Sequence, residues 1–151
     1  EMCIRDRILR VVSRPYMFTA SLPPGVIAAT EAALHQLRTR PALRQRLNEN
    51  ALRLYRGLAG LGFELGPEPS PVVSAIMPSP EAAFGFWAAL LKAGLYTNVS
   101  LPPATPKGLA LLRSSVSAAH SPDQIDQAIT LFAQVGQSLG LLGAPALVSA
   151  K

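Results

Sequence analysis

The segment Leu101–Ile125 restricts the possible folds of this 151-residue chain more than any other part of it. It opens with a proline-rich stretch, 102–106, which cannot donate to a sheet ladder and is therefore predicted to be a shaped loop. The apolar run over 109–117 predicts a strand. Ser121 and Gln124 then stand in a capping-box pattern, which predicts the start of a helix. A loop, a strand and a helix in such close succession require a fold that mixes α and β elements.

The spacing of apolar residues predicts the rest of an α+β domain, in which helices pack on a small, mainly antiparallel sheet. Apolar positions recur every three to four residues in the predicted helices and form short runs in the predicted strands. Together with the strand and helix above, the order is helix, helix, strand, helix, strand, strand, helix. The further helices are expected over 24–38, 41–61 and 80–93, and the further strands over 72–77 and 95–99.

These helices carry an apolar stripe that predicts which side is buried. The inner face of the 24–38 helix is expected to consist of Val26, Ile27, Thr30, Ala33, Leu34 and Leu37. The 80–93 helix, with Ser79 as its N-cap and Gly94 as its end, is expected to bury Ala83, Phe84, Trp87, Leu90 and Leu91.

Composition excludes several classes of protein. Apolar residues make up 49% of the chain and charged residues 15%, so a disordered chain is not expected. The longest apolar run, around 87–91, is much shorter than the ~18 residues of a membrane-spanning helix. The single cysteine, Cys3, excludes an internal disulfide framework and is typical of a reducing, cytoplasmic location.

The net charge of +5 does not by itself indicate nucleic-acid binding. The arginines between Arg5 and Arg56 are spread over the start of the chain and over helix surfaces, whereas phosphate binding favours basic residues clustered with stacking aromatics. A solvated helix face is the favoured interpretation, and nucleic acid is not expected as a partner. The alternative is a non-catalytic helical module that uses the basic face over 38–56 to bind acidic lipid headgroups or nucleic acid.

Arg113 is the first candidate for a binding residue. It lies inside the apolar run that predicts a strand, where an unpaired charge would be costly to bury. A planar carboxylate is the partner that suits a guanidinium best, because two parallel hydrogen bonds form at once. The plainer alternative is an arginine on an edge strand that pairs with an acid of the chain itself.

Two segments, 14–24 (RPYMFTASLPP) and 101–125, resemble the α-oxoamine synthases in the same order as they occur in that family. These are pyridoxal-phosphate enzymes of the fold type I, aminotransferase class I and II superfamily. The resemblance covers about 8–139 and is to the C-terminal part of the enzyme. It implies a homodimer with a shared active site that condenses an amino acid with an acyl-CoA and releases CO2.

The resemblance also implies roles for individual residues. Arg113 matches the arginine that holds the substrate's α-carboxylate, and Thr19 matches a hydroxyl that reaches the cofactor phosphate in the other subunit. Ser21 is a weaker candidate for the same phosphate. The Schiff-base lysine has no counterpart among Lys92, Lys107 and Lys151, so this chain alone is expected to be inactive. His120, directly before a capping serine, is expected to form structural hydrogen bonds, and no metal-ligand cluster is expected.

Within the family, the chain resembles the bacterial serine palmitoyltransferases most. That branch implies L-serine and a long-chain acyl-CoA as substrates and a 3-keto sphingoid base as product. Leu101 departs from the pattern, because an arginine is expected directly before the Pro-Pro-Ala-Thr-Pro motif. Synthases that use glycine or alanine therefore stay open, as does a catalytically inactive partner subunit.

The resemblance divides the chain into four segments. Residues 1–7 do not continue it and are expected to be a non-native leader. Residues 8–40 are expected to form the end of a large domain and a connecting helix. Residues 41–139 are expected to form the C-terminal α+β domain, followed by a tail over 140–151.

Overall fold

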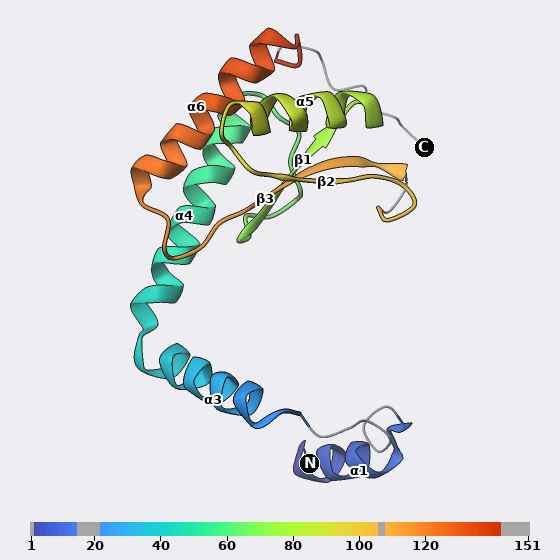
Figure 1. Cartoon of the computed structure of the whole chain (residues 1–151), viewed down its shortest axis with the longest axis vertical. Helices are drawn as coiled ribbons and strands as arrows, with labels where there is room; N and C mark the ends of the chain where they lie inside the picture. The colour runs from blue at the N-terminus through green and yellow to red at the C-terminus, as the bar shows by residue number, and fades with distance from the viewer. Residues whose placement is uncertain (1, 15–21, 106–107, 143–151) are drawn as a thin grey trace. The chain divides into compact units, whose positions relative to one another are not determined.

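The computed structural model describes residues 2–14, 22–105 and 108–142 (Figure 1). Contacts divide the chain into two compact units, Glu1–Arg40 and Pro41–Lys151. The assignment of these regions to a large and a C-terminal domain stays a prediction. No helix in the described ranges is both long enough and apolar enough to span a membrane.

The first unit contains helices α1 (Met2–Val12) and α3 (Pro24–Thr39). Helix α1 includes most of residues 1–7. That these residues are a non-native leader stays a prediction. Helix α3 begins at Pro24 as expected, because proline tolerates the first helical position, where its missing N–H costs nothing.

The predicted burial of the α3 stripe is wrong for this chain. Val26, Ile27, Leu34 and Leu37 are each about half exposed, and the helix has no buried residue. The periodicity of a helix shows which side is apolar, but the surface that covers this side must come from elsewhere, and the described residues of the first unit do not supply it.

The second unit begins with α4 (Pro41–Gly60), which follows the prediction closely. Its inner face buries Ala51, Leu54 and Leu58. The chain leaves the helix through Gly62 at φ +91°. Residues with a side chain rarely adopt this backbone conformation, so glycine is favoured here.

Three short strands form an antiparallel sheet in the order β1-β3-β2. They are β1 (Val72–Met77), β2 (Asn98–Ser100) and β3 (Ala110–Ser115). Strand β1 has the predicted bounds, whereas β2 begins three residues later than expected. The reason is that Leu95 closes α5 instead, by donating its N–H to the carbonyl of Leu90 at 2.9 Å.

Helices α5 (Pro80–Lys92) and α6 (Pro122–Ser138) complete the core together with α4. The rings of Phe86 and Phe132 meet edge to face at 5.4 Å, and Phe63 lies 5.7 Å from each of them. The largest fully buried side chains are Phe86, Phe132, Leu58, Leu90 and Leu112.

The predicted buried face of α5 is partly wrong. Ala83 and Leu90 are buried as expected, but Phe84 is 58% exposed and Leu91 43% exposed, while Phe86 is fully buried. The buried line runs through 83, 86 and 90 and shares positions 83 and 90 with the expected face. An apolar stripe this wide shows which side faces the core, but not which of its residues lie at the centre.

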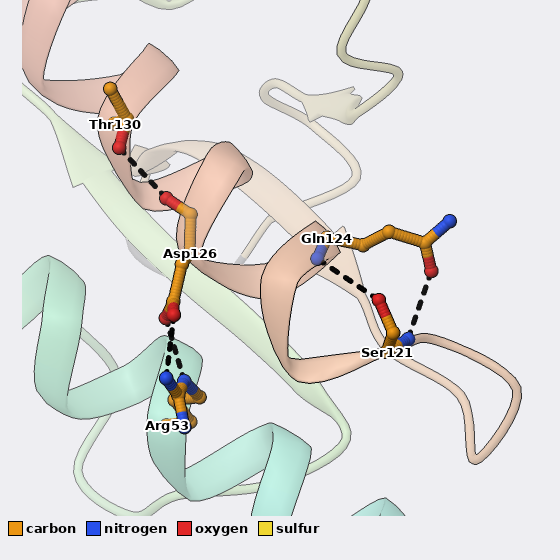
Figure 2. A network of polar contacts seen from close by, with 5 residues as sticks. All are labelled: Arg53, Ser121, Gln124, Asp126 and Thr130. Atoms are coloured by element: carbon orange, nitrogen blue, oxygen red, sulfur yellow. Dashed lines mark hydrogen bonds and ion pairs between the residues drawn. The ribbon is translucent and has the colours of Figure 1, made fainter.

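The capping box at the start of α6 is confirmed. The Ser121 hydroxyl accepts from the backbone N–H of Gln124, and the Gln124 side chain accepts from the backbone N–H of Ser121 at 2.9 Å (Figure 2). One turn further along, the Asp126 carboxylate accepts both hydrogen bonds of the Arg53 guanidinium, at 2.6 and 2.5 Å. These contacts fix the start of α6 and join it to α4.

Candidate functional site

The two faces of the sheet differ sharply in what covers them. Helices α4, α5 and α6 gather on one side, where Val73, Ala75 and Leu112 are buried (Figure 1). Along β3, buried residues alternate with half-buried or exposed ones, because successive side chains in a strand point to opposite faces. We call the other side the open face; it carries Val72, Ser74, Ile76, Asn98, Ser100, Leu111, Arg113 and Ser115.

Arg113 lies at the centre of the open face. Its strand, β3, is the middle one of the three, so the alternative of an arginine on an edge strand is wrong. In the register of the sheet, Arg113 pairs with Ser74 of β1 on one side and with Asn98 of β2 on the other. Directly paired residues share a face, so these three polar side chains form a row across the sheet.

The guanidinium of Arg113 is exposed, in contrast to the predicted buried charge. The reason is that every described helix of this unit packs on the opposite face. In the described part of the chain, ion pairs join Arg5 to Asp6 and Arg53 to Asp126, and none involves Arg113. The cation is therefore available to an anion that the described residues do not provide.

Asn98 is a polar neighbour of Arg113 that the sequence analysis missed. Its Oδ1 accepts a hydrogen bond from the hydroxyl of Tyr96 at 3.2 Å, and Tyr96 is 71% exposed. Alternation along the strand predicted over 95–99 could have indicated that Tyr96 and Asn98 share a side. Their position beside Arg113, however, depends on the pairing of two strands separated by a loop, which no local pattern reveals.

Leu101 does not belong to the open face. It directly follows β2 and packs, half-buried, against the core together with Val99. It also lines a shallow hollow beside the edge strand β2, with Phe84, Trp87 and Tyr96. At the position where an arginine was expected, this chain therefore has an apolar side chain on the core side of the sheet.

His120 makes structural hydrogen bonds. Its Nδ1 accepts from the backbone N–H of Ser117 at 3.2 Å. The carbonyls of Ser117 and His120 both accept from the side-chain amide of Asn50, each at 3.0 Å. Asn50 is almost fully buried, so this contact ties the turn between β3 and α6 to helix α4. The expected structural role of His120 agrees with this geometry.

The remaining candidates are not brought into the site. Thr19, Ser21, Lys107 and Lys151 lie outside the described residues, and Lys92 is an exposed residue in the last turn of α5. Within the described ranges, no group of three His, Cys, Asp or Glu side chains could hold a metal ion.

The basic face over 38–56 is divided between the two units of the chain. One of its arginines, Arg53, is occupied by Asp126. The hydrogen bonds from Arg53 lower the pKa of the Asp126 carboxyl, and the same contact raises the pKa of Arg53. This part of the molecule therefore offers fewer free cations than the sequence indicates.

The second unit thus has helices on one face of a small antiparallel sheet and, at the centre of the other face, an arginine with no ion-pair partner among the described residues. Residues 4–132 match the aminotransferase class I and II family, and the chain belongs to that family.

The chain is similar to serine palmitoyltransferases. It is 51% identical to the enzyme from Caulobacter vibrioides over 144 residues, which are 93% of this chain and 36% of that protein. The structure matches a Sphingomonas wittichii serine palmitoyltransferase with a TM-score of 0.83 at 40% identity, over 91% of this chain and 35% of the other. It also matches a structure of serine palmitoyltransferase with a pyridoxal-phosphate internal aldimine, with a TM-score of 0.85 at 41% identity and the same coverage. The chain thus spans about a third of the length of the proteins it matches.

Proposed function

We propose that this chain is the C-terminal part of a pyridoxal-phosphate-dependent acyltransferase. The reaction is the condensation of an amino acid, L-serine, with a long-chain acyl-CoA, with loss of CO2 and formation of a 3-keto sphingoid base. The observation that carries the proposal is Arg113, a cation at the centre of the open face with no carboxylate partner among the described residues.

Arg113 would bind the α-carboxylate of the amino acid. A guanidinium offers two parallel N–H groups to a carboxylate, so it fixes the direction of the bound group as well as its position. With the carboxylate fixed, rotation about the α-carbon is restricted, and one bond of that carbon is held in the orientation in which it breaks. The central strand suits this task, because β1 and β2 hold β3 on both sides.

Pyridoxal phosphate, when bound, supplies the electron sink that makes cleavage at the α-carbon possible. The open face fits the carboxylate end of the amino acid, since it offers a cation and polar neighbours without a competing acid. Thr19, and more weakly Ser21, would donate to the cofactor phosphate of the other subunit in a homodimer. The Schiff-base lysine would come from a part of the protein that this sequence does not include.

The choice of L-serine rests on the 51% identity to a serine palmitoyltransferase. Leu101 argues for keeping glycine and alanine as alternative substrates, because its apolar side chain packs with the core and offers no donor to a carboxylate. A direct comparison of the three amino acids as substrates of the full-length protein separates these possibilities.

Replacement of Arg113 tests the proposal in the full-length protein. Loss of one partner of a charged, hydrogen-bonded pair costs about 2–5 kcal/mol, so Arg113→Ala should weaken L-serine binding at least ~30-fold. Binding is measured from the change in cofactor absorbance as L-serine is added, and cofactor affinity should change much less. Arg44→Ala, an exposed arginine on α4, is the matched control. Unchanged L-serine binding by Arg113→Ala would overturn the proposed role.

A further inference from the structure

We infer that Asn98 is a second recognition residue for the amino-acid substrate. Its side-chain N–H groups donate to the same carboxylate that Arg113 binds, and Tyr96 holds the amide in the orientation that this requires. The inference rests on the proposed function, since it adds a residue to the same binding site.

Asn98 lies beside Arg113 in the sheet. Asn98 of β2 pairs directly with Arg113 of β3, and the two strands run antiparallel side by side (Figure 1). The Cβ atoms of directly paired residues in such a ladder lie about 4.5–5.5 Å apart and point to the same face. A carboxylate held by the guanidinium is therefore within reach of the neighbouring amide.

The side-chain amide of Asn98 has a partner at one of its two ends. The Tyr96 hydroxyl donates to Oδ1 of Asn98, so the oxygen end of the side chain is occupied. The nitrogen end, Nδ2, has two N–H donors and makes no hydrogen bond to another residue in the described part of the chain. A hydroxyl donor at Oδ1 fixes which end of the side chain carries the free N–H groups, so Tyr96 orients the amide.

A neutral donor beside Arg113 suits the hydrogen-bonding capacity of a carboxylate. A carboxylate has two oxygens and about four acceptor positions, more than one guanidinium fills, so a neutral donor beside the arginine adds a hydrogen bond without adding charge. An acid at position 98 would instead pair with Arg113 and exclude the substrate. Asparagine has nearly the shape of aspartate but lacks this competing charge.

The test compares variants of the full-length protein by their KM and kcat for L-serine and by their affinity for the acyl-CoA. Loss of one hydrogen bond to a charged group weakens binding by about 10- to 100-fold, so Asn98→Ala should raise the KM for L-serine by about that factor. The affinity for acyl-CoA should stay within about threefold. Tyr96→Phe should act in the same direction but less strongly, because the amide remains and only its orientation is lost.

Asn98→Asp is the most informative variant. It keeps the shape of the side chain and places a carboxylate directly opposite Arg113. It should impair L-serine binding more than Asn98→Ala does. Ser115→Asp is the matched control, since it places the same charge on the open face of β3 two residues away, opposite Val72. Equal effects of the two aspartates would show a general effect of charge and would overturn the inference.

Arg113→Ala separates the two proposals. If Arg113→Ala loses L-serine binding while Asn98→Ala and Tyr96→Phe bind it normally, the role of Asn98 is wrong and the proposed function stands. If Arg113→Ala itself binds L-serine normally, the proposed function fails as well. Thermal unfolding of each variant distinguishes lost recognition from lost folding, and Tyr96→Phe keeps the inference testable if the position 98 variants do not fold.

Discussion

The helix-covered face and the open face of the same small sheet show how one strand serves two purposes. On the covered face, Leu112 packs among the aromatic and aliphatic side chains of three helices. On the open face, one residue further along β3, Arg113 has no acidic partner among the described residues. The alternation of a β-strand thus separates the residues that hold the unit together from those that remain available for binding.

The largest expected effect comes from breaking the covered face. Phe132→Ala removes a fully buried ring that contacts Phe86 and Phe63, so it should lower the free energy of unfolding by about 3–5 kcal/mol. Arg113→Ala, on the open face, should change stability by no more than about 0.5 kcal/mol. Urea denaturation of both variants of the chain measures the difference. Similar losses for the two would contradict the division between the faces.

A smaller effect should follow from removing the cap of α6. Ser121→Ala deletes the hydroxyl that accepts from the backbone of Gln124, and loss of an N-cap costs about 1 kcal/mol. The helix lies on the covered side, so the effect should appear in stability measured by urea denaturation. Ser121→Asp restores an acceptor at the same position and should recover most of the loss. A stability unchanged by Ser121→Ala would show that the capping box does not stabilise α6.

The smallest effect concerns the exposed pair Arg53–Asp126, which lies outside both faces. Because the hydrogen bonds from Arg53 lower the pKa of Asp126 in the folded chain, the carboxylate contributes stability above its unfolded pKa, about 3.9. That contribution is lost as the pH falls through the lower folded pKa. Asp126→Asn should therefore be less stable than the unchanged chain at pH 7 and equally stable in stronger acid. Urea denaturation across this pH range checks the prediction, and a difference that persists in acid would contradict it.

The sequence predicted the features that depend on nearby residues. The bounds of β1, the start of α4 at Pro41 and the capping box at Ser121 were all expected from local patterns, and the structure confirms them. Each depends on contacts within a few residues, so turn chemistry and apolar spacing are sufficient to find it.

The features that the sequence did not predict depend on distant contacts. Phe86, and not Phe84, is the buried aromatic residue of α5 because α6 and Phe63 meet it there. The stripe of α3 is apolar, but the described residues of its own unit do not cover it. In the candidate site, Arg113 was found from its own surroundings, whereas Asn98 becomes a neighbour only through the pairing of β2 with β3.

The antiparallel register restricts how the length of β3 can vary. A shift of β3 by one residue would exchange the two faces, sending the guanidinium into the core and Leu112 into the solvent. The loop before β3 is tied to the same register, because the hydroxyl of the buried Thr105 donates to the carbonyl of Leu109, directly before β3, at 2.5 Å. Insertions and deletions should accordingly be avoided within β3, where a single added residue would both destabilise the unit and remove its cation from the open face.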